Sequence, residues 1–352
     1  MSTYYTLKVR ELIKETDEAI TLVFENPAKG KLSYKPGQFL TLILPIENEK
    51  LRRSYSLCTA STIDEFPAVT IKKTINGKAS NYLVNTLKKG DVLEVMQPAG
   101  TFTIETRRFN SRKVVLIGAG SGITPLMGIA KAVLADEPLS AVYLLYGSRN
   151  EQSIIFEKKL EELTLKYKDR LKVIHVLSQP SNDWKGHTGR LNRPSIIKLL
   201  ETFPSFKFEK ADYFVCGPEG MMHEAVEAFK LLRIPSDKIH KESFASSTPQ
   251  ETGHIVNSNP IADTEVMVIY QGTEYKFKVP ASQTILQAAL DQDIDLPYSC
   301  QSGLCTACMG KCVSGKVKLD ETDALSDKEL ERGYVLTCVG HPVTNDVVIE
   351  ID

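Results

Sequence analysis

Apolar and polar residues alternate in short stretches through the first hundred positions of the chain, and turn-forming residues separate these stretches. The alternation predicts strands at Tyr5–Leu12, Ala19–Glu25, Phe39–Leu44, Ser54–Thr59, Ala68–Lys73 and Gly100–Ile104. One helical pattern, Ser80–Lys88, interrupts them. Evenly spaced short strands are typical of a small antiparallel β-barrel, so we expect a barrel domain over residues 1–110.

From residue 113 onward, apolar strands alternate with helical segments. Strands are expected at Lys113–Ile117, Ala141–Tyr146, Leu171–Ser178, Ala211–Cys216 and Lys238–Ser243. Helices are expected at Thr124–Ala135, Gln152–Tyr167, Pro194–Glu201 and Pro218–Leu232. This alternation predicts a parallel sheet with helices on both faces, that is, an α/β domain over residues 111–245.

Residues 246–262 lack periodicity and are rich in Ser, Thr, Asn and Pro, which predicts a linker. Beyond it, strands are expected at Glu265–Tyr270, Thr273–Val279 and Val347–Ile351, with a helix at Pro280–Asp291. The chain is therefore expected to be multidomain, with a third, α+β domain over residues 263–352.

Composition and charge add three expectations. The chain starts without the apolar segment of a signal peptide and contains no long apolar run, so we expect a cytoplasmic protein without membrane insertion. Seven cysteines in a reducing compartment favour metal binding over disulfides. Residues 263–352 hold 15 acidic and 7 basic residues and the remainder 29 and 36, an asymmetry that argues for protein docking and against nucleic-acid binding.

Four cysteines carry the strongest motif. Cys300, Cys305 and Cys308 are spaced C-x₄-C-x₂-C, and Cys338 follows at a distance. This is the spacing of plant-type [2Fe-2S] clusters, in which four thiolates hold two irons. The alternatives are structural cysteines or zinc, but zinc sites favour two short cysteine pairs and only one is present. Two further cysteines, Cys58 and Cys312, are expected to be packed thiols.

The stretch Arg52–Ser56 combines a guanidinium, a phenol ring and a hydroxyl. These groups can pair with phosphate, stack on an isoalloxazine ring and hydrogen-bond its N5 atom. An exposed edge strand is the simpler interpretation of the stretch by itself. The stretch resembles the flavin signature of the ferredoxin-NADP reductase superfamily, and this resemblance implies that Arg53, Tyr55 and Ser56 bind a flavin.

A second stretch, Asn76–Leu83, resembles the pyrophosphate turn of the same superfamily. A glycine turn that opens a helix presents backbone N–H groups to an anion. The alternative is an ordinary loop capped by Ser80. The resemblance implies that Gly77 and Ser80 hold the flavin pyrophosphate, and it favours FAD over FMN.

The glycine-rich turn Gly118, Gly120, Gly122 and Thr124 follows a strand and opens a helix. By resemblance, this loop binds the pyrophosphate of a nicotinamide nucleotide, and Thr124 approaches the nicotinamide. Arg149 follows the next strand, where a guanidinium can pair with the 2′-phosphate of NADPH. We therefore expect NADPH, with NADH as the alternative.

Three residues in sequence, Cys216, Gly217 and Pro218, end the fourth parallel strand, at the edge where open α/β sheets bind ligands. A buried strand cysteine is the simpler interpretation. The superfamily resemblance places Cys216 beside the nicotinamide, with Gly217 and Pro218 at the cofactor. It also implies that Glu242 lies at the redox centre and that Phe244 covers the flavin, so that Ser56, Cys216, Glu242 and Phe244 form the catalytic set.

The last ninety residues resemble a plant-type ferredoxin domain, which implies a β-grasp fold. Together with the preceding reductase motifs, the chain resembles the reductase component of a multicomponent oxygenase. It is most similar to the reductase subunits of phenylacetyl-CoA epoxidases, through Arg52–Ser56, Ser80–Leu83 and Gly333–Cys338. The resemblance implies electron transfer from NADPH through FAD and a [2Fe-2S] cluster to a di-iron oxygenase of phenylacetate catabolism.

Two other functions stay open at this point. One is an FMN- and NADH-dependent reductase of a Rieske-type ring-hydroxylating dioxygenase. The other is a non-catalytic electron carrier or redox sensor, against which the intact Arg53, Tyr55, Ser56, Gly120 and Cys216 argue. The sequence does not identify the terminal oxygenase, its substrate or the oligomeric state.

Overall fold

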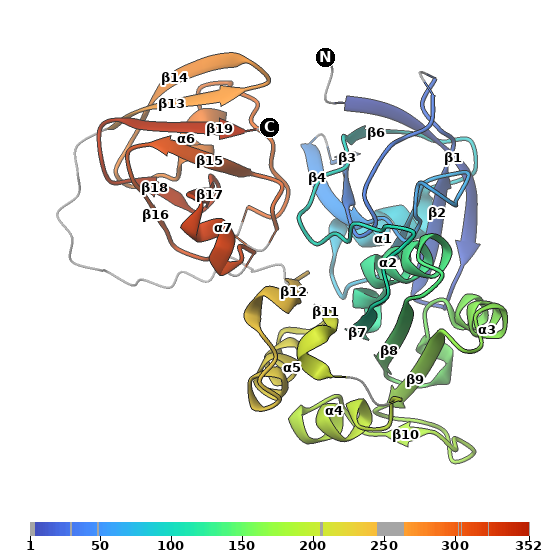
Figure 1. The fold of residues 1–352 in the computed structure, drawn as a ribbon. Coiled ribbons are helices and arrows are strands. Elements are labelled where there is room, and N and C mark those ends of the chain that lie inside the picture. The colour runs from blue at the N-terminus through green and yellow to red at the C-terminus, as the bar shows by residue number, and fades with distance from the viewer. Residues whose placement is uncertain are drawn as a thin grey trace. The chain divides into compact units, whose positions relative to one another are not determined.

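The computed structural model describes residues 4–28, 30–47, 49–204, 207–244, 264–301, 303, 305–322 and 324–351. The chain forms two compact units, one over Ser2–Phe244 and one over Ala245–Asp352 with Met1 (Figure 1). The linker expected at 246–262 lies outside the described residues. Within the described ranges, no helix is both long and apolar enough to span a bilayer.

The first unit begins with a curled antiparallel sheet. Its strands are β1 (Tyr4–Lys14), β2 (Ala19–Phe24), β3 (Phe39–Ile46), β4 (Glu49–Ser56), β5 (Ala68–Lys72) and β6 (Val92–Met96). They lie in the order β4-β3-β6-β1-β2-β5, and a bridge between Leu57 and Val69 brings the end of β4 to β5. Alternate strand residues fill the interior, and α1 (Lys78–Thr86) adds Leu83 to it. The expected antiparallel barrel is confirmed.

One expected strand of the barrel is wrong. Residues Gly100–Ile104 form no strand, and β6 supplies the sixth strand of the sheet instead. The misleading signal came from Phe102 and Ile104, which are buried two positions apart as in a strand. They belong to the segment that leaves the barrel, where the Thr103 N–H bonds to the Thr101 carbonyl in a tight turn. Alternating burial therefore does not by itself require a sheet.

The second part of this unit is a parallel sheet. Its strands are β7 (Lys113–Ala119), β8 (Ala141–Ser148), β9 (Leu171–Leu177), β10 (His187–Thr188), β11 (Asp212–Cys216) and β12 (Ile239–Glu242). Their order is β10-β9-β8-β7-β11-β12, and every pairing is parallel. The helices are α2 (Ile123–Asp136), α3 (Glu157–Lys166), α4 (Arg193–Leu200) and α5 (Glu219–Leu231). Short 3₁₀ turns lie at Gly120–Gly122, Glu151–Ser153, Phe208–Lys210 and Ser236–Lys238.

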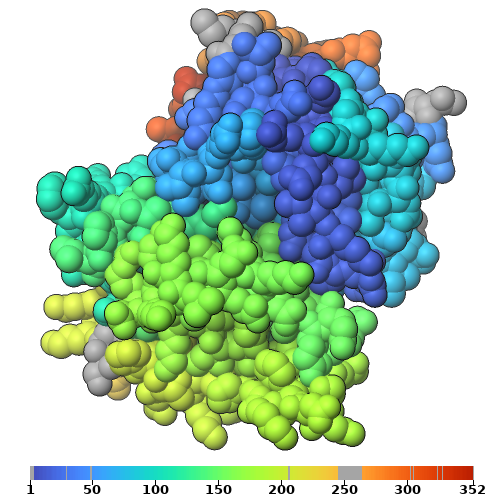
Figure 2. Space-filling model, turned by 90° about the vertical axis from the view of Figure 1, so that its right-hand side faces the viewer, coloured from blue at the N-terminus to red at the C-terminus, as the bar shows by residue number. Residues whose placement is uncertain are grey.

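Two hydrophobic cores lie on the two faces of this sheet. Val114 and Leu116 pack with α2 and α3 in one core, whereas Val115 and Ile117 pack with α4 and α5 in the other. Strands buried on both faces explain why β7 is an unbroken apolar run. The core on the α2 side also takes in barrel residues such as Ala68, so the barrel packs directly against the α/β domain (Figure 2).

The second unit is a mixed sheet with two short helices. Its strands are β13 (Thr264–Tyr270), β14 (Thr273–Val279), β15 (Met309–Ser314), β17 (Tyr334–Leu336) and β19 (Val347–Ile351). The order is β14-β13-β19-β15-β17, and β13 and β19 form the one parallel pair among these described strands. Beside this sheet are α6 (Ile285–Leu290), α7 (Asp327–Glu331) and the pair β16 (Val317–Leu319) and β18 (Gly340–Pro342). The α+β class is as expected.

Candidate flavin, nucleotide and cluster sites

Three of the expected catalytic residues come together at the carboxyl edge of the parallel sheet. Cys216 ends β11 and lies in register with Gly118 of β7 on one side and with Glu242 of β12 on the other. The hydroxyl of Ser56, at the end of barrel strand β4, donates to the Glu242 carboxylate at 3.3 Å. A residue of the barrel and a residue of the last sheet strand therefore meet at one place, 186 positions apart in the chain.

The surroundings of these groups favour their neutral forms. Burial raises the pKa of Glu242 to about 8, although the hydrogen bond from Ser56 opposes the shift. Burial also raises the pKa of the Cys216 thiol well above its ordinary value, and the nearby Glu242 carboxylate adds to this shift. A carboxyl that is protonated near neutral pH can hold and deliver a proton, which is typical of functional sites. Phe244 follows at the end of the described segment with 42% of its surface exposed.

The glycine turn between β7 and α2 is tightly packed against β11. A Cβ atom on Gly122 would lie 2.0 Å from the carbonyl oxygen of Cys216, so only glycine fits. Gly120 has a φ of +56°, a left-handed conformation that glycine adopts without strain. Thr124 is buried, and its hydroxyl donates to the Ser121 carbonyl at 2.9 Å within the turn. The structure thus shows Thr124 closing the turn rather than pointing outward.

A second backbone turn faces this one. Gly217 has a φ of +159°, and a Cβ there would lie 3.0 Å from the backbone nitrogen of Ala119. Pro218 is the N-cap of α5 and has no side-chain cap of its own. Glycine and proline therefore let the chain turn sharply from β11 into α5 beside the Gly118–Gly122 turn.

Lys72 is a neighbour of this site that the sequence analysis missed. Its ammonium nitrogen lies 3.9 Å from the position that a Cβ on Gly120 would take, and it forms an ion pair with Glu18 at 3.7 Å. A lysine from the barrel thus lies close to the glycine turn of the α/β domain. Its place at the end of an expected strand was no signal, because only the fold brings β5 to this turn.

Arg149, which is expected to pair with the 2′-phosphate of NADPH, is exposed just beyond β8. Its backbone N–H donates to Ser153 and its carbonyl accepts from Gln179, which fixes the backbone and leaves the side chain at the surface. Since Gly147 of β8 pairs with Ala119 of β7, Arg149 lies at the same edge of the sheet as the glycine turn.

The flavin motif of the barrel lies on β4. Arg53 and Tyr55 pair across the sheet with Leu42 and Leu40, so their side chains share one face, as expected. Arg53 is exposed, and its guanidinium donates to the Arg52 carbonyl at 2.7 Å. Burial raises the pKa of the Tyr55 phenol, while the Arg53 charge opposes this shift. A cation and an aromatic ring therefore lie next to one another beside Ser56.

Gly77 and Ser80 shape the start of α1. Gly77 is the N-cap, and a Cβ there would lie 2.5 Å from the Thr74 hydroxyl oxygen. The buried Ser80 hydroxyl accepts from the Thr74 backbone N–H at 3.1 Å and contacts the Thr74 hydroxyl at 2.8 Å. Ser80 therefore closes the turn before the helix. The first backbone N–H groups of α1 can then bind an anion.

The four motif cysteines meet within the second unit. Their thiols lie near enough to shift one another's pKa: Cys300 raises the pKa of Cys305, and Cys300 and Cys308 raise that of Cys338. Hydrogen bonding with Cys338 lowers the pKa of Cys308, whereas bonding with Cys300 raises that of Cys305. Three of the cysteines come from one loop and the fourth from the segment after β17, so the fold brings distant thiols together.

Backbone contacts hold this arrangement. The Thr337 N–H and hydroxyl both donate to the Cys308 carbonyl at 3.2 Å, which ties the two cysteine segments together. Among the described residues, no three His, Cys, Asp or Glu side chains are arranged as ligands of a metal ion. The cluster assignment therefore depends on the cysteine spacing, the mutual thiol contacts and the domain match given below.

The two remaining cysteines that the sequence analysis considered are packed thiols. Cys312 lies on β15 and contacts the Ser314 carbonyl at 3.1 Å. Cys58 is buried in the core between barrel and α/β domain, and burial raises its pKa to about 11. Both expectations are confirmed.

Comparison with known families matches three domain models in succession. They are an oxidoreductase FAD-binding domain over residues 6–104, an oxidoreductase NAD-binding domain over 116–227 and a 2Fe-2S iron-sulfur cluster binding domain over 268–343. The order agrees with the expected arrangement of flavin, nucleotide and cluster motifs. These domains define an NAD(P)H-dependent oxidoreductase that carries FAD and a [2Fe-2S] cluster.

Relatives along the whole chain make the class more specific. One component of 1,2-phenylacetyl-CoA epoxidase from Escherichia coli (strain K12) is 34% identical, and the match covers 100% of this chain and 99% of the relative. The ferredoxin reductase component of 3-ketosteroid-9-alpha-monooxygenase from Mycolicibacterium smegmatis is 35% identical, covering 98% and 96%. The chain belongs to this family of oxygenase reductases, which join a ferredoxin-NADP reductase module to a ferredoxin domain.

Solved structures show the same fold. Phthalate dioxygenase reductase has a TM-score of 0.60 at 23% identity, and the match covers 99% of this chain and 98% of that one. The flavohem-like FAD/NAD-binding domain of nitric oxide dioxygenase from Vibrio cholerae O1 biovar El Tor has a TM-score of 0.59 at 28% identity, covering 68% and 98%. The match along the full length of phthalate dioxygenase reductase thus agrees with the expected fold class.

Proposed function

We propose that this chain takes a hydride from NADPH and passes the electrons through FAD and the [2Fe-2S] cluster to a separate oxygenase in the cytoplasm. The observation that carries the proposal is the meeting of Ser56, Cys216 and Glu242 beside the glycine turn that follows β7. It combines a flavin motif, a nucleotide turn and a proton-holding carboxyl in one unit. The cluster cysteines in the other unit provide the exit for electrons.

The residues would hold the cofactors as follows. Arg53, Tyr55 and Ser56 with Gly77 and Ser80 would bind FAD through phosphate pairing, ring stacking and backbone N–H groups. When bound, FAD supplies the chemistry that accepts two electrons as a hydride and releases them singly to a one-electron cluster. The cluster would be held by the four thiolates of Cys300, Cys305, Cys308 and Cys338.

The nucleotide would be held at the facing turns. Gly118, Gly120, Gly122, Thr124, Gly217 and Pro218 would shape a backbone surface for its pyrophosphate. Lys72 would add a positive charge over that surface, and Arg149 would pair with the 2′-phosphate, which favours NADPH over NADH. Phe244 would cover the flavin until the nicotinamide enters, so that hydride transfer occurs in a site from which water is excluded.

The boundaries of the proposed domains follow from the same assignments. Residues 1–110 would bind FAD, 111–245 the nucleotide and 263–352 the cluster, with 246–262 as the linker between them. An acidic cluster domain joined to a basic reductase suits successive weak docking, first on its own reductase and then on the oxygenase. Such contacts would be screened over a Debye length of about 8 Å at physiological salt.

We infer a di-iron oxygenase such as a phenylacetyl-CoA epoxidase as the acceptor, because a component of that enzyme matches along the entire chain. A steroid monooxygenase is the second candidate, since a reductase component of such a system is equally similar. Purified oxygenases of the two kinds distinguish these: the true partner should support NADPH-dependent product formation with this reductase at a much higher rate.

The electron route is tested by replacing one cluster cysteine. Cys305→Ser should abolish NADPH-driven reduction of cytochrome c, which requires the cluster, while reduction of ferricyanide by the flavin continues. Cys312→Ser, on a packed strand thiol, is the matched control and should retain both activities. Flavin content is measured first in each variant. If Cys305→Ser reduces cytochrome c at the wild-type rate, the cluster is not the exit route and the proposal fails.

A further inference from the structure

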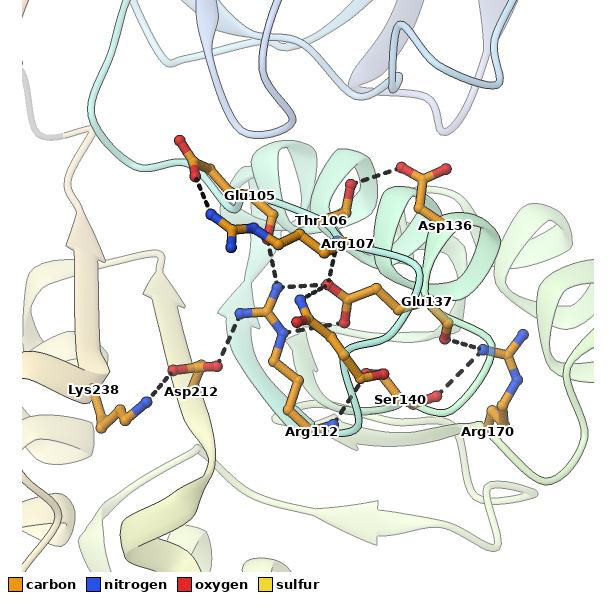
Figure 3. Close-up of polar contacts among 11 residues, drawn as sticks. Glu105, Thr106, Arg107, Arg112, Asp136, Glu137, Ser140, Arg170, Asp212 and Lys238 are labelled. Atoms are coloured by element: carbon orange, nitrogen blue, oxygen red, sulfur yellow. Dashed lines mark hydrogen bonds and ion pairs between the residues drawn. The ribbon is translucent and has the colours of Figure 1, made fainter.

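A group of charged side chains lies at the edge of the parallel sheet opposite to the catalytic residues. We call Arg112, Glu137, Asp212 and Lys238 the Arg112 cluster (Figure 3). The Glu137 side chain is fully buried and accepts two hydrogen bonds from the Arg112 guanidinium, at 2.7 and 3.1 Å. Burial alone would raise the pKa of Glu137, but hydrogen bonds from Arg112 and Asn110 lower it. The pair is therefore ionised, and its two hydrogen bonds fix the orientation of the guanidinium relative to the carboxylate.

The cluster joins the starting points of three neighbouring strands. Arg112 immediately precedes β7, Asp212 is the first residue of β11, and Lys238 immediately precedes β12. Arg112 donates to the Asp212 carboxylate at 3.2 Å, and Lys238 donates to the other oxygen of that carboxylate at 3.0 Å. Side-chain bonds thus hold the three strands together where they begin, in addition to the backbone ladder.

The same three strands end at the proposed site of hydride transfer. Gly118 on β7, Cys216 on β11 and Glu242 on β12 lie in one row of the sheet. Cys216 is four positions after Asp212, a span of about 13 Å at ~3.3 Å per residue. The cluster is too far away to touch the reacting atoms, so any effect on the reaction must pass through the strands.

Arg112 and Glu137 also hold the segment that leads out of the barrel. The guanidinium donates to the Glu105 carbonyl at 2.7 Å, and the Arg107 N–H donates to the Glu137 carboxylate at 3.3 Å. Glu137 is itself the C-cap of α2, the helix that begins at the nucleotide turn. One ion pair therefore binds the exit of the flavin domain to both the strands and the helix that carry the nucleotide site.

We propose that Arg112 is a positioning residue, which fixes the nucleotide turn at the correct distance from the flavin motif of the barrel. This inference rests on the proposed function, because it concerns the rate of hydride transfer between those two sites. Hydride transfer requires near-contact of donor and acceptor, and a displacement of about 1 Å can lower such a rate by roughly a hundredfold. The guanidinium suits this task because its planar fork bonds in several directions at once.

The test follows flavin reduction in a single turnover. The full-length, FAD-loaded protein is mixed rapidly with NADPH without oxygen, and the limiting rate and the nucleotide Kd are read separately. Arg112→Met should lower the limiting rate by roughly ten- to a hundredfold, with little change in Kd. Arg112→Lys should restore only part of the rate, since an ammonium keeps the charge but lacks the fork.

Arg170→Met is the matched control. Arg170 also donates to the end of α2, at the Leu134 and Glu137 carbonyls at 2.7 and 2.9 Å, but its bonds reach neither the barrel exit nor β11. This variant should keep the wild-type limiting rate. If it slows as much as Arg112→Met, the effect is a general loosening of α2 and the inference is overturned.

Removing one partner of a buried ion pair can prevent folding, so a double variant completes the test. Arg112→Met combined with Glu137→Met leaves no unpaired buried charge, and such apolar replacements often fold well. This double variant should be stable, and its limiting rate of flavin reduction should still be lower than that of the wild type. A wild-type limiting rate in a folded, FAD-replete Arg112 variant overturns the inference alone. Failure of the wild-type flavin to accept electrons from NADPH or NADH overturns the proposed function and this inference with it.

Discussion

The carboxyl of Glu242 makes the folding stability of the unit over Ser2–Phe244, here called the reductase unit, depend on pH. Its pKa is raised by burial to about 8 in the folded chain, from an ordinary value of 4.5. The folded protein therefore binds this proton more tightly than the unfolded chain does. The stability that results is fully present below pH 4.5 and is lost as the pH rises from there through about 8.

Glu242→Gln stays neutral throughout this range and should not lose stability in that way. The Tm of the variant relative to wild type should therefore increase steadily between about pH 5 and about pH 8.5. Thermal unfolding at a series of pH values measures it, with Glu11→Gln, an exposed glutamate of β1, as the control. Parallel curves for Glu242→Gln and wild type would contradict the assignment of a raised pKa.

At the scale of elements, the turn between β7 and α2 packs closely against the end of β11. Gly122 packs directly on the Cys216 carbonyl, so the helix and strand β11 share one backbone contact. A methyl group here must push apart the two elements that carry the nucleotide turn and the thiol. Overpacking of this kind typically costs about 1–3 kcal/mol.

Gly122→Ala should lower the stability of the reductase unit by about that amount and reduce NADPH-dependent ferricyanide reduction more strongly than FAD binding. Gly220→Ala is the matched control, because a Cβ at Gly220, in the first turn of α5, meets no atom within 4 Å. Chemical denaturation and steady-state kinetics give the two readouts. An active, fully stable Gly122→Ala protein would show that the contact is not required.

Elements with a local sequence signal could be predicted, whereas contacts between elements that are distant in the sequence could not. The spacing of Cys300 to Cys308 and the strand–turn–helix at Gly118 each depend on a short stretch of sequence, so both could be predicted. The position of Lys72 over Gly120 depends on two domains packing together, and no local pattern encodes it. The false strand at Gly100–Ile104 has the same origin, since its buried residues serve a contact between domains and not a sheet.

At the scale of the whole molecule, the flavin and nucleotide motifs lie in one compact unit and the cluster cysteines lie in the other. The unit over Ser2–Phe244 contains the flavin and nucleotide motifs together with their contacts, and it has its own hydrophobic cores. A protein ending at Phe244 should therefore fold, bind FAD and reduce ferricyanide with NADPH, yet fail to reduce cytochrome c. Flavin release with mass spectrometry and the two acceptor assays check this, and recovery of FMN in place of FAD would refute the flavin assignment.

The contact between Ser56 and Glu242 has a consequence for how the protein is made. Its two partners are 186 positions apart, and Glu242 ends the last strand of its unit. During synthesis, the barrel and most of the parallel sheet leave the ribosome before this strand does. A nascent chain can therefore form the barrel and most of the parallel sheet while Glu242 is still missing. The contact between Ser56 and Glu242, and with it the proposed redox site, is therefore completed only when the last strand of this unit has been synthesised.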